Sequence, residues 1–310
     1  MPAKKYLIVI GGPTASGKTK AAIKVANHFG IDIISADSRQ FYREMDIGTA
    51  KPSAVELAQA PHHFINNLSI HDEYTAGDFE REVIPFLDQL YESHDMAILA
   101  GGSGFFIQAV TEGLDDFPEV PKEVRAKIEN DFKEKGLAYL QQQVKAVEPE
   151  YFEVMDNKNP HRLIRALSVY VASGQPFSSF LYQDPKMRNF EPIFICLEMQ
   201  RPFLYNRINK RVDKMMNKGL LKEAEKLYPF RHLTPLQTVG YAELFDYFDG
   251  KYSLPEAIEL IKRNSRRYAK RQMTWFRKKT YWNKFYAKDP AAIIKFVSLR
   301  MQADSEDWRE

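Results

Sequence analysis

The 310-residue chain contains a single cysteine, Cys196. One cysteine excludes an internal disulfide and any zinc site built from several thiolates. The sequence also lacks an apolar run of 18 or more residues, and its N-terminus lacks the apolar segment and small-residue cleavage site of a signal peptide. We therefore expect a cytoplasmic protein that does not enter a membrane. Cys196 lies in the apolar run 192–197, which is typical of a buried strand and not of a nucleophile.

Acidic residues are absent from residues 262–279, although the chain has 41 Asp and Glu in total. The segment holds nine Lys or Arg, so the net charge of +3 conceals a net negative charge in the remaining residues. Tyr268, Trp275 and Phe276 are interleaved with these cations. Cations for phosphates and rings for stacking are what binding to single-stranded or loop RNA requires, whereas a merely solvated helix usually carries acids among its bases.

The hydrophobic content of 44% and the charged content of 27% are ordinary for a globular protein with a sizeable core. Strand-like and helix-like segments alternate up to residue 114, helical patterning dominates 115–189, and strand character returns at 192–197. This order predicts an α/β fold with a parallel sheet, flanking helices and an inserted all-helical domain. Residues 12–19 fit the pattern G-x-x-x-x-G-K-[ST], so the sheet is expected to be of the P-loop NTPase kind. We assign residues 1–114 and 190–310 to the core and 115–189 to the insertion.

A phosphate-binding loop follows the apolar run 6–10 and precedes a helix-like stretch. Its sequence fits the pattern G-x-x-x-x-G-K-[ST] in the strand-to-helix context that this motif requires. The residues are Gly12, Pro13, Thr14, Ala15, Ser16, Gly17, Lys18 and Thr19. Backbone N–H groups at the helix start and the Lys18 ammonium would hold a polyphosphate or diphosphate, and the Thr19 hydroxyl would bind Mg²⁺.

Polar residues follow two further predicted strands, 31–36 and 95–100. Asp37 ends the first, and the turn Gly101-Gly102-Ser103-Gly104 ends the second. Ligands of open parallel sheets bind outside the carboxyl ends of strands, so both should lie near the phosphate loop. Alternatively, Asp37 is a helix cap or turn residue and the glycine turn only joins a strand to a helix. Arg207 and Arg211 share a helix face, which is also typical of a solvated basic surface.

Helix boundaries are marked by short local signals. The pairs Thr75-x-x-Asp78 and Ser253-x-x-Glu256 predict capping boxes. The second of these opens a helix that we expect to reach about Tyr281, and Asp289-Pro290 opens a last one.

Taken together, these segments resemble the tRNA dimethylallyltransferases, which prenylate the exocyclic amine of the adenine directly 3′ of certain anticodons. The resemblance extends over about residues 6 to 285. Its most specific segments are Asp37-Ser38-Arg39-Gln40, Asp46-Ile47-Gly48-Thr49-Ala50-Lys51, and Lys270-Arg271-Gln272-Met273-Thr274-Trp275. Residues 162–167, 207–213 and 239–241 match as well.

The resemblance implies an enzyme that transfers a dimethylallyl group from dimethylallyl diphosphate to tRNA. The phosphate loop would hold the diphosphate, and Lys18, Thr19 and Mg²⁺ would stabilise the charge of the leaving group. Asp37 would accept the proton of the attacking amine. Arg211 would add positive charge at the diphosphate, and Ser103, where the family usually has Thr, would contact the leaving group or the RNA.

The resemblance also implies an RNA-contacting set and partners. The set consists of Asp37, Ser38, Arg39, Gln40, Ser103, Arg125, His161, Arg162, Leu163, Ile164, Arg165, Gln237, Thr238, Val239, Gly240, Tyr241, Ala242, Lys270, Arg271, Gln272, Met273, Thr274, Trp275, Phe276 and Arg277. The expected partners are the anticodon stem-loop of tRNA and dimethylallyl diphosphate, and the chain is expected to act as a monomer. Arg39, Glu44 and Ser103 depart from the usual family pattern.

Three other functions use the same loop. A P-loop kinase would transfer phosphate from ATP to a small metabolite, and it would leave the basic segment unexplained. A prenyltransferase that acts on free adenine nucleotides would not need an RNA-binding surface. An RNA-binding ATPase would turn over ATP in the presence of RNA without transferring a prenyl group.

Overall fold

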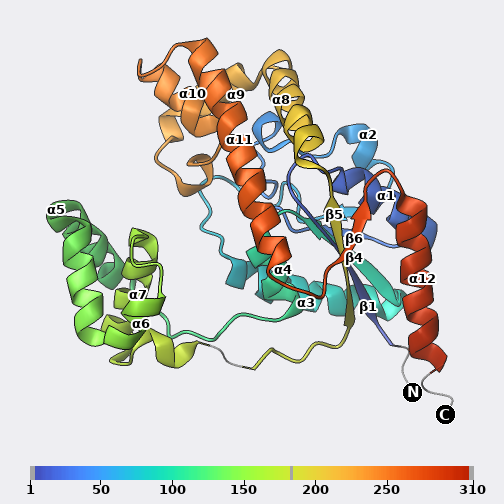
Figure 1. Cartoon of the computed structure of the whole chain (residues 1–310), viewed down its shortest axis with the longest axis horizontal. Coiled ribbons are helices and arrows are strands. Elements are labelled where there is room, and N and C mark those ends of the chain that lie inside the picture. The colour runs from blue at the N-terminus through green and yellow to red at the C-terminus, as the bar shows by residue number, and fades with distance from the viewer. Residues whose placement is uncertain (1–3, 182–183, 307–310) are drawn as a thin grey trace. The chain divides into compact units, whose positions relative to one another are not determined.

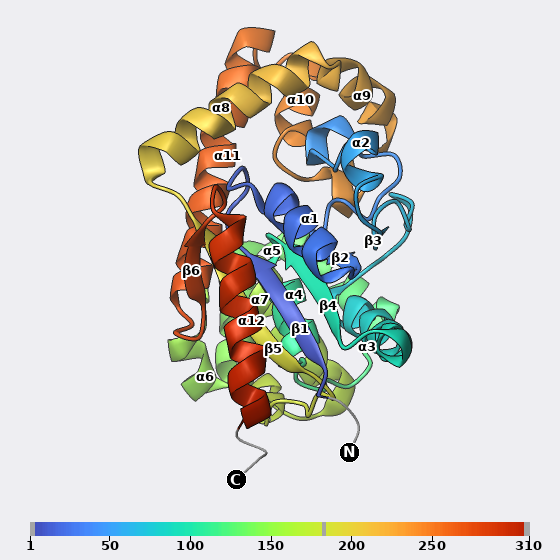
Figure 2. The ribbon, with the colours of Figure 1, turned by 90° about the vertical axis from the view of Figure 1, so that its right-hand side faces the viewer.

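The computed structural model (Figure 1) describes residues 4–181 and 184–306. These include a six-stranded sheet in the order β3-β2-β4-β1-β5-β6 (Figure 2). The strand pairs are parallel. The strands are β1 (Tyr6–Gly11), β2 (Ile33–Ser35), β3 (His62–His63), β4 (Met96–Gly101), β5 (Glu191–Glu198) and β6 (Asn283–Tyr286). Because all strands run in one direction, the residues after β1, β2 and β4 meet at one edge of the sheet. The predicted P-loop-like α/β fold is confirmed.

Both faces of the sheet are buried, which explains why β1 is continuously apolar. Leu7 and Val9 join one hydrophobic cluster, and Ile8 and Ile10 join another on the opposite face. Helices α1 (Lys18–Phe29) and α12 (Pro290–Glu306) cover the second face (Figure 2). Burial of each such side chain contributes about 1.5–3 kcal/mol to folding.

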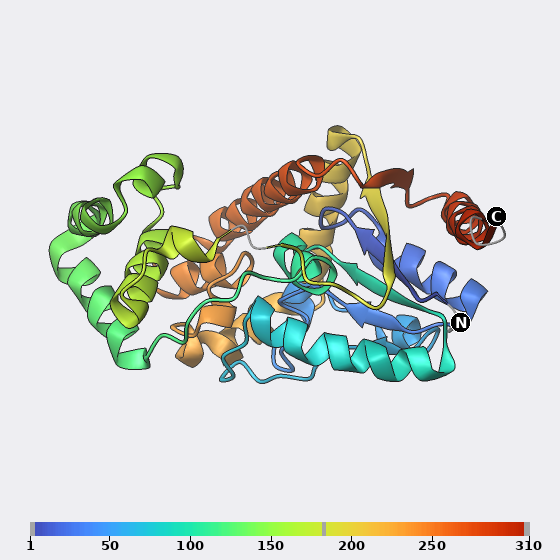
Figure 3. The same ribbon diagram turned by 90° about the horizontal axis from the view of Figure 1, so that it is seen from below.

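The other face of the sheet is covered by α3 (Ala76–Ser93), which lies opposite α1 (Figure 3), and by α4 (Gly104–Thr111). Helices α8 (Arg201–Asn217) and α11 (Leu254–Arg277) pack against each other, and α10 (Tyr241–Phe248) contacts both α11 and α9 (Leu220–Leu227). The remaining short elements of this part are α2 (Ala54–Leu57), η1 (Ile47–Thr49), η3 (Tyr228–Phe230) and η4 (Thr234–Leu236).

The predicted helix boundaries agree with the structure where a cap residue marks them. Thr75 accepts a hydrogen bond from the Asp78 amide at the start of α3, and Ser253 accepts one from the Glu256 amide at the start of α11. Both capping boxes are complete. Gly30 ends α1 in the left-handed conformation with φ 64°, as the C-terminal stop requires.

In the C-terminal region one expectation is wrong and one strand was not predicted. The long helix ends at Arg277 and not near Tyr281, and strand β6 is absent from the predicted elements. The cause is tertiary packing: the rings of Tyr281 and Trp282 lie 4.2 and 5.0 Å from the ring of Phe194 on β5. Trp282 is only 6% exposed, and its burial draws the chain out of the helix and into the pairing of β6 with β5.

Residues 113–186 form a separate compact unit, and residues 1–112 and 187–310 make up the other. This smaller unit contains α5 (Lys122–Val147), α6 (Pro149–Val154), α7 (Pro160–Ser173) and η2 (Phe177–Phe180). Its own core includes Leu140, Val144 and Leu163, each fully buried. A kink at Gly136, where φ is 78°, divides α5. The predicted insertion, 115–189, overlaps this helical unit.

Candidate active site

The phosphate loop begins where β1 ends and finishes in the first turn of α1. Gly12 and Gly17 have φ values of 145° and 106°, which side chains of L-residues disfavour. A Cβ atom on Gly12 would also lie 2.8 Å from the Leu197 carbonyl oxygen. The two glycines therefore let the chain curl tightly in front of the helix, so that the N-terminal amides of α1 face the space enclosed by the loop.

Lys18 folds back over this loop. Its Nζ donates hydrogen bonds to the carbonyl oxygens of Gly12 and Pro13, both at 2.9 Å. Burial lowers the pKa of Lys18 to about 8; the Asp37 carboxylate opposes this shift and Arg211 adds to it. The ammonium group is thus held in a poorly solvated position, where a bound anion would restore its ordinary basicity.

Asp37 lies two residues beyond β2, on the strand-end edge that also carries the phosphate loop. Its Oδ1 accepts a hydrogen bond from the Arg39 amide at 3.2 Å, so the predicted turn role is real. That contact engages one carboxylate oxygen. The charge of Asp37 also acts on Lys18 and Arg211, because it opposes the lowering of both their pKa values. The turn role and a role in the site therefore coexist in one side chain.

The glycine turn after β4 packs directly on the segment that carries Asp37. A Cβ atom on Gly101 would lie 2.0 Å from the Ala36 carbonyl oxygen, so no side chain fits there. Ser103 Oγ accepts a hydrogen bond from the Ser38 amide at 3.0 Å and donates one to Ser38 Oγ at 3.1 Å. Ser103 thus connects the glycine turn to the Asp37 segment.

Two arginines of α8 reach the phosphate loop from the other side. Arg211 Nη1 lies 3.3 Å from Thr14 Oγ1, and its Nη2 lies 3.5 Å from the Thr49 carbonyl oxygen. Burial lowers the pKa of Arg211, Asp37 opposes this shift, and Arg207 adds to it. Arg207 Nη2 would be 3.8 Å from a Cβ atom on Gly17, so it also borders the loop. The alternative of a solvated basic face is excluded for Arg211.

Tyr268 of α11 lies at the site but is absent from the site residues predicted from the sequence. Desolvation of its hydroxyl raises its pKa to about 12 although 36% of the residue is exposed, and Asp37 adds to the shift. Arg39 and a hydrogen bond with the Ser103 side chain oppose it. The phenol therefore interacts with the Ser103 side chain and lies within electrostatic range of the Asp37 carboxylate. Its only sequence signal was its place among the basic residues of 262–279.

The segment around Gly48 is held by α9 and α10. Glu223 accepts hydrogen bonds from the amides of Ile47 and Gly48 at 2.8 and 2.9 Å, and from the Tyr241 hydroxyl at 2.6 Å. Tyr241 is fully buried, and a Cβ atom on Gly48 would lie 2.5 Å from its ring. These contacts explain both the Asp-Ile-Gly-Thr pattern and the aromatic residue that follows Gly240.

The predicted RNA-contacting residues fall into three groups by exposure. The exposed ones are Arg125, His161, Arg162, Arg165, Gln237, Ala242, Lys270, Arg271, Thr274 and Arg277. The partly buried ones are Asp37, Ser38, Arg39, Gln40, Ser103, Thr238, Val239 and Trp275. The buried ones are Gly240, which has no side chain, and Leu163, Ile164, Tyr241, Gln272, Met273 and Phe276, whose side chains pack inside the protein. For this last group, RNA contact through the side chain has no support in the structure.

The helical unit of residues 113–186 carries the remaining basic candidates. The Arg165 guanidinium lies 5.0 Å from the centre of the Phe117 ring, a cation–π arrangement. Arg125 pairs with Glu129 at 2.9 Å, and burial together with the charge of Arg125 lowers the pKa of Arg165. The two arginines are within electrostatic range of each other, and His161 and Arg162 lie on the first turn of α7.

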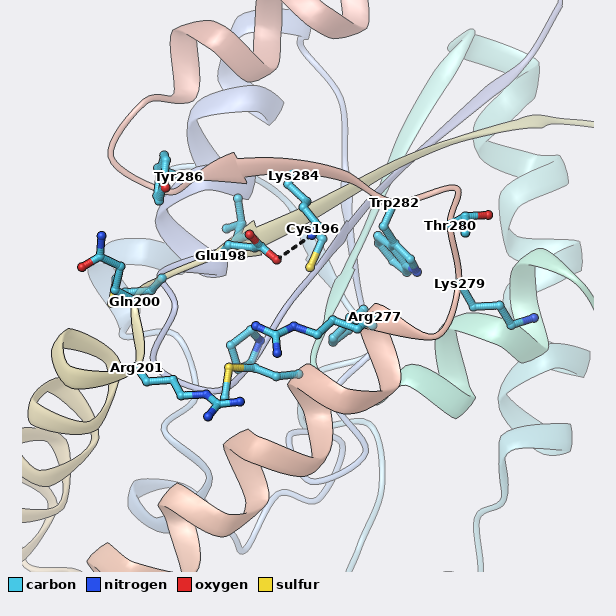
Figure 4. Close-up of a pocket in the computed structure, with 15 residues that line it drawn as sticks. Cys196, Glu198, Gln200, Arg201, Arg277, Lys279, Thr280, Trp282, Lys284 and Tyr286 are labelled. Carbon is cyan, nitrogen blue, oxygen red and sulfur yellow. Dashed lines mark ion pairs between the residues drawn. The ribbon is translucent and has the colours of Figure 1, made fainter.

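A cavity of about 450 Å³ lies between the ends of β5, β6 and α11 (Figure 4). Cys196 and Trp282 form part of its wall, and Arg201 and Arg277 line it with cations. Cys196 is 5% exposed, and burial raises its pKa to about 12. This thiol is a buried strand residue, as predicted.

The metal-ligating side chains around the loop suit a metal ion that takes its other ligands from a substrate. Within residues 4–181 and 184–306, no group of three His, Cys, Asp or Glu side chains could hold a metal. The Thr19 hydroxyl lies on the first turn of α1, directly after Lys18. A hydroxyl oxygen is a ligand of the kind that Mg²⁺ takes, with phosphate oxygens and water as its other ligands.

Comparisons with known proteins give a consistent result. A family model described as IPP transferase matches residues 40–279. A tRNA dimethylallyltransferase of Christiangramia forsetii is 55% identical over 273 residues, which cover 88% of this chain and 90% of that protein. One from Flavobacterium johnsoniae is 50% identical over 94% of this chain and 97% of its own length. The crystal structure of the full-length tRNA isopentenylpyrophosphate transferase from Bacillus halodurans superposes with a TM-score of 0.74 at 34% identity, covering 99% of this chain and all of that one.

Proposed function

The chain belongs to the IPP transferase family, and from this premise we propose that it transfers a dimethylallyl group from dimethylallyl diphosphate to tRNA. The acceptor is the N6 amine of the adenine directly 3′ of the anticodon. The observation that carries the proposal is the meeting of the phosphate loop, Asp37 and Arg211 at one edge of the sheet, beside the inner face of the basic helix α11.

The reaction exchanges one bond for another at the allylic carbon. The adenine nitrogen forms a C–N bond while the C–O bond to diphosphate breaks, and the released amine proton goes to Asp37. A carboxylate suits this role because one of its oxygens is not engaged by the Arg39 amide. Ser103, which is hydrogen-bonded to Ser38 next to Asp37, would hold the segment that carries the carboxylate.

The leaving group is stabilised by fixed positive charge. Lys18 and Arg211 lie at the phosphate loop, and both are poorly solvated, which strengthens their attraction for an anion. Thr19 would hold Mg²⁺ together with the diphosphate oxygens, and the ion would neutralise charge on the leaving group. One chain supplies all of these groups, which is consistent with a monomeric enzyme.

The RNA would be bound by cations of two units of the chain. Arg267, Lys270, Arg271 and Thr274 form an exposed basic surface on α11. Arg125 and Arg165 provide cations on the helical unit of residues 113–186. An adenine must leave the base stack to reach a site at the strand ends, so extensive contacts with the RNA backbone are needed.

A P-loop kinase is not favoured, since relatives of 50–55% identity carry the name of a tRNA dimethylallyltransferase. The decisive experiment incubates the protein with radiolabelled dimethylallyl diphosphate, Mg²⁺ and either total tRNA or AMP. We expect the label on tRNA only. Label on AMP alone, or ATP turnover without prenyl transfer, would overturn the proposal.

A further inference from the structure

We propose that Gln272 is a positioning residue of the diphosphate site. Its side chain holds the phosphate loop against the glycine turn after β4. The inference rests on the proposed function in naming diphosphate as the ligand. It assigns to the side chain of Gln272 a task inside the protein and not on the RNA surface.

The side-chain amide of Gln272 bridges two backbone segments that are distant in sequence. Its Oε1 accepts a hydrogen bond from the Thr14 amide at 2.8 Å, and its Nε2 donates one to the Gly102 carbonyl oxygen at 2.9 Å. One partner is a donor and the other an acceptor, so they define which end of the amide is oxygen. The residue is only 7% exposed, so water offers little competition for either bond.

Gly102 supplies independent support for this contact. Its φ is not in the left-handed region, so backbone conformation does not require glycine here. A Cβ atom on Gly102 would lie 2.5 Å from Gln272 Nε2 and 3.5 Å from Lys18 Nζ. The missing side chain is therefore what allows the amide to approach, and the amide lies close to the loop lysine.

An amide suits this position better than other polar side chains. A carboxylate would bring negative charge to a loop that receives an anion, and it could not donate to the Gly102 carbonyl. A lysine could not accept from the Thr14 amide. Without Gln272, both backbone groups would lose their partners, and an unsatisfied buried polar group is costly.

The opposite side of the same helical turn is exposed. Lys270, Arg271 and Thr274 line the outer surface of α11, while Gln272 points inward. Residues 270–277 thus divide into an outer set that suits RNA and an inner set that supports the phosphate loop. Trp275 packs on the glycine turn itself, since a Cβ atom on Gly104 would lie 2.3 Å from its ring.

The test uses the full chain and two probes, inorganic diphosphate with Mg²⁺ in calorimetry and radiolabelled dimethylallyl diphosphate in prenyl transfer to tRNA. Gln272→Met retains the volume but removes both hydrogen bonds. We expect its diphosphate affinity and its kcat/KM for the prenyl substrate to fall about 10-fold or more, with tRNA affinity within about threefold of the unchanged protein. Ile261→Val on the same helix is the control for reduced core packing, and it should change neither quantity.

Gln272→Glu adds a second measurement, the pH dependence of activity, which a role in packing alone would not change. A protonated Glu presents the same donor and acceptor as Gln, so activity relative to the unchanged protein should recover as pH falls. Gly102→Ala leaves Gln272 in place but displaces its amide, and it should weaken diphosphate binding like Gln272→Met. This variant carries the test if Gln272→Met does not fold.

Two results would overturn the inference: diphosphate affinity unchanged in both Gln272→Met and Gly102→Ala, or an equal loss in Ile261→Val. Failure of the proposed function has a different signature. In that case the unchanged protein binds diphosphate but transfers no prenyl group to tRNA, while the dependence of diphosphate binding on Gln272 is still measurable.

Discussion

The Asp37 carboxylate is the residue on which the proposed chemistry depends most directly. Asp37→Asn retains the oxygen that accepts from the Arg39 amide but is a far weaker base. We expect turnover to fall about 10²-fold or more, the range for loss of a general base, while tRNA and diphosphate affinities stay within about threefold. Single-turnover prenyl transfer and separate binding titrations measure this. Unchanged turnover would remove Asp37 from the mechanism.

The lowered pKa of Lys18 predicts that diphosphate binding depends on pH. Burial lowers its pKa to about 8, so the unliganded site loses this charge as pH rises through that value. Between pH 7 and pH 9 the protonated fraction falls about tenfold, and diphosphate affinity should weaken by about the same factor. Calorimetry at several pH values measures the effect, and Lys18→Arg, which stays charged, is the control. Identical pH profiles for the two proteins would contradict the prediction.

The same group has the opposite effect on folding. The unfolded chain keeps the Lys18 proton up to about 10.5, whereas the folded chain releases it near 8. Across this window the unfolded state binds more protons, so the contribution of Lys18 to the free energy of unfolding rises with pH. Deprotonation of Lys18 is therefore expected to weaken binding above pH 8 without itself destabilising the fold.

At the scale of elements, α11 joins two tasks in one helix. Its inner face contacts the phosphate loop through Gln272, and its outer face carries Arg267, Lys270 and Arg271. Replacing Arg267 and Lys270 with Ala should lower tRNA affinity and reduce the slope of its salt dependence by about one for each RNA phosphate that is no longer neutralised. The KM for dimethylallyl diphosphate should stay the same.

Filter binding of tRNA at several salt concentrations measures this slope. Lys24→Ala on α1 is the matched control, because Lys24 is an exposed lysine away from the basic helix. Equal slopes for the double variant and the unchanged protein would show that the outer face of α11 does not bind the RNA backbone.

At the scale of the whole molecule, the proposed diphosphate site lies in one compact unit and part of the proposed RNA-binding surface lies in the other. Residues 113–186 have their own hydrophobic core, and among the described residues of both units no helix is long and apolar enough to cross a membrane. Replacing residues 113–186 with a short Gly-Ser linker should leave diphosphate affinity within about threefold, because the phosphate loop and its contacts lie in the other unit. The affinity for tRNA should fall about tenfold or more, since Arg125 and Arg165 are removed with the unit.

Circular dichroism verifies that the shortened protein is folded, calorimetry measures its diphosphate affinity, and filter binding measures its tRNA affinity. Retention of full tRNA affinity would mean that the helical unit does not contact the RNA. Loss of diphosphate binding would mean that the phosphate loop depends on the helical unit.

Much of the fold and part of the site follow from the sequence alone. The phosphate loop, the capping boxes of α3 and α11, and the glycine that ends α1 depend on contacts between residues only a few positions apart. Asp37 and Ser103 were also predictable, because a parallel sheet brings the ends of its strands together whatever the lengths of the connections.

Only the tertiary structure decided which face of α11 meets the phosphate loop. Gln272 and Thr14 are 258 positions apart, and no local pattern relates them. The burial of Tyr241 behind Gly48 and the extended path from Tyr281 into β6 likewise depend on distant partners. Local preferences are encoded by neighbouring residues, whereas these contacts result from the packing of the whole core. The sequence by itself therefore determined which residues lie at the strand ends, and tertiary packing determined which face of the basic helix contacts them.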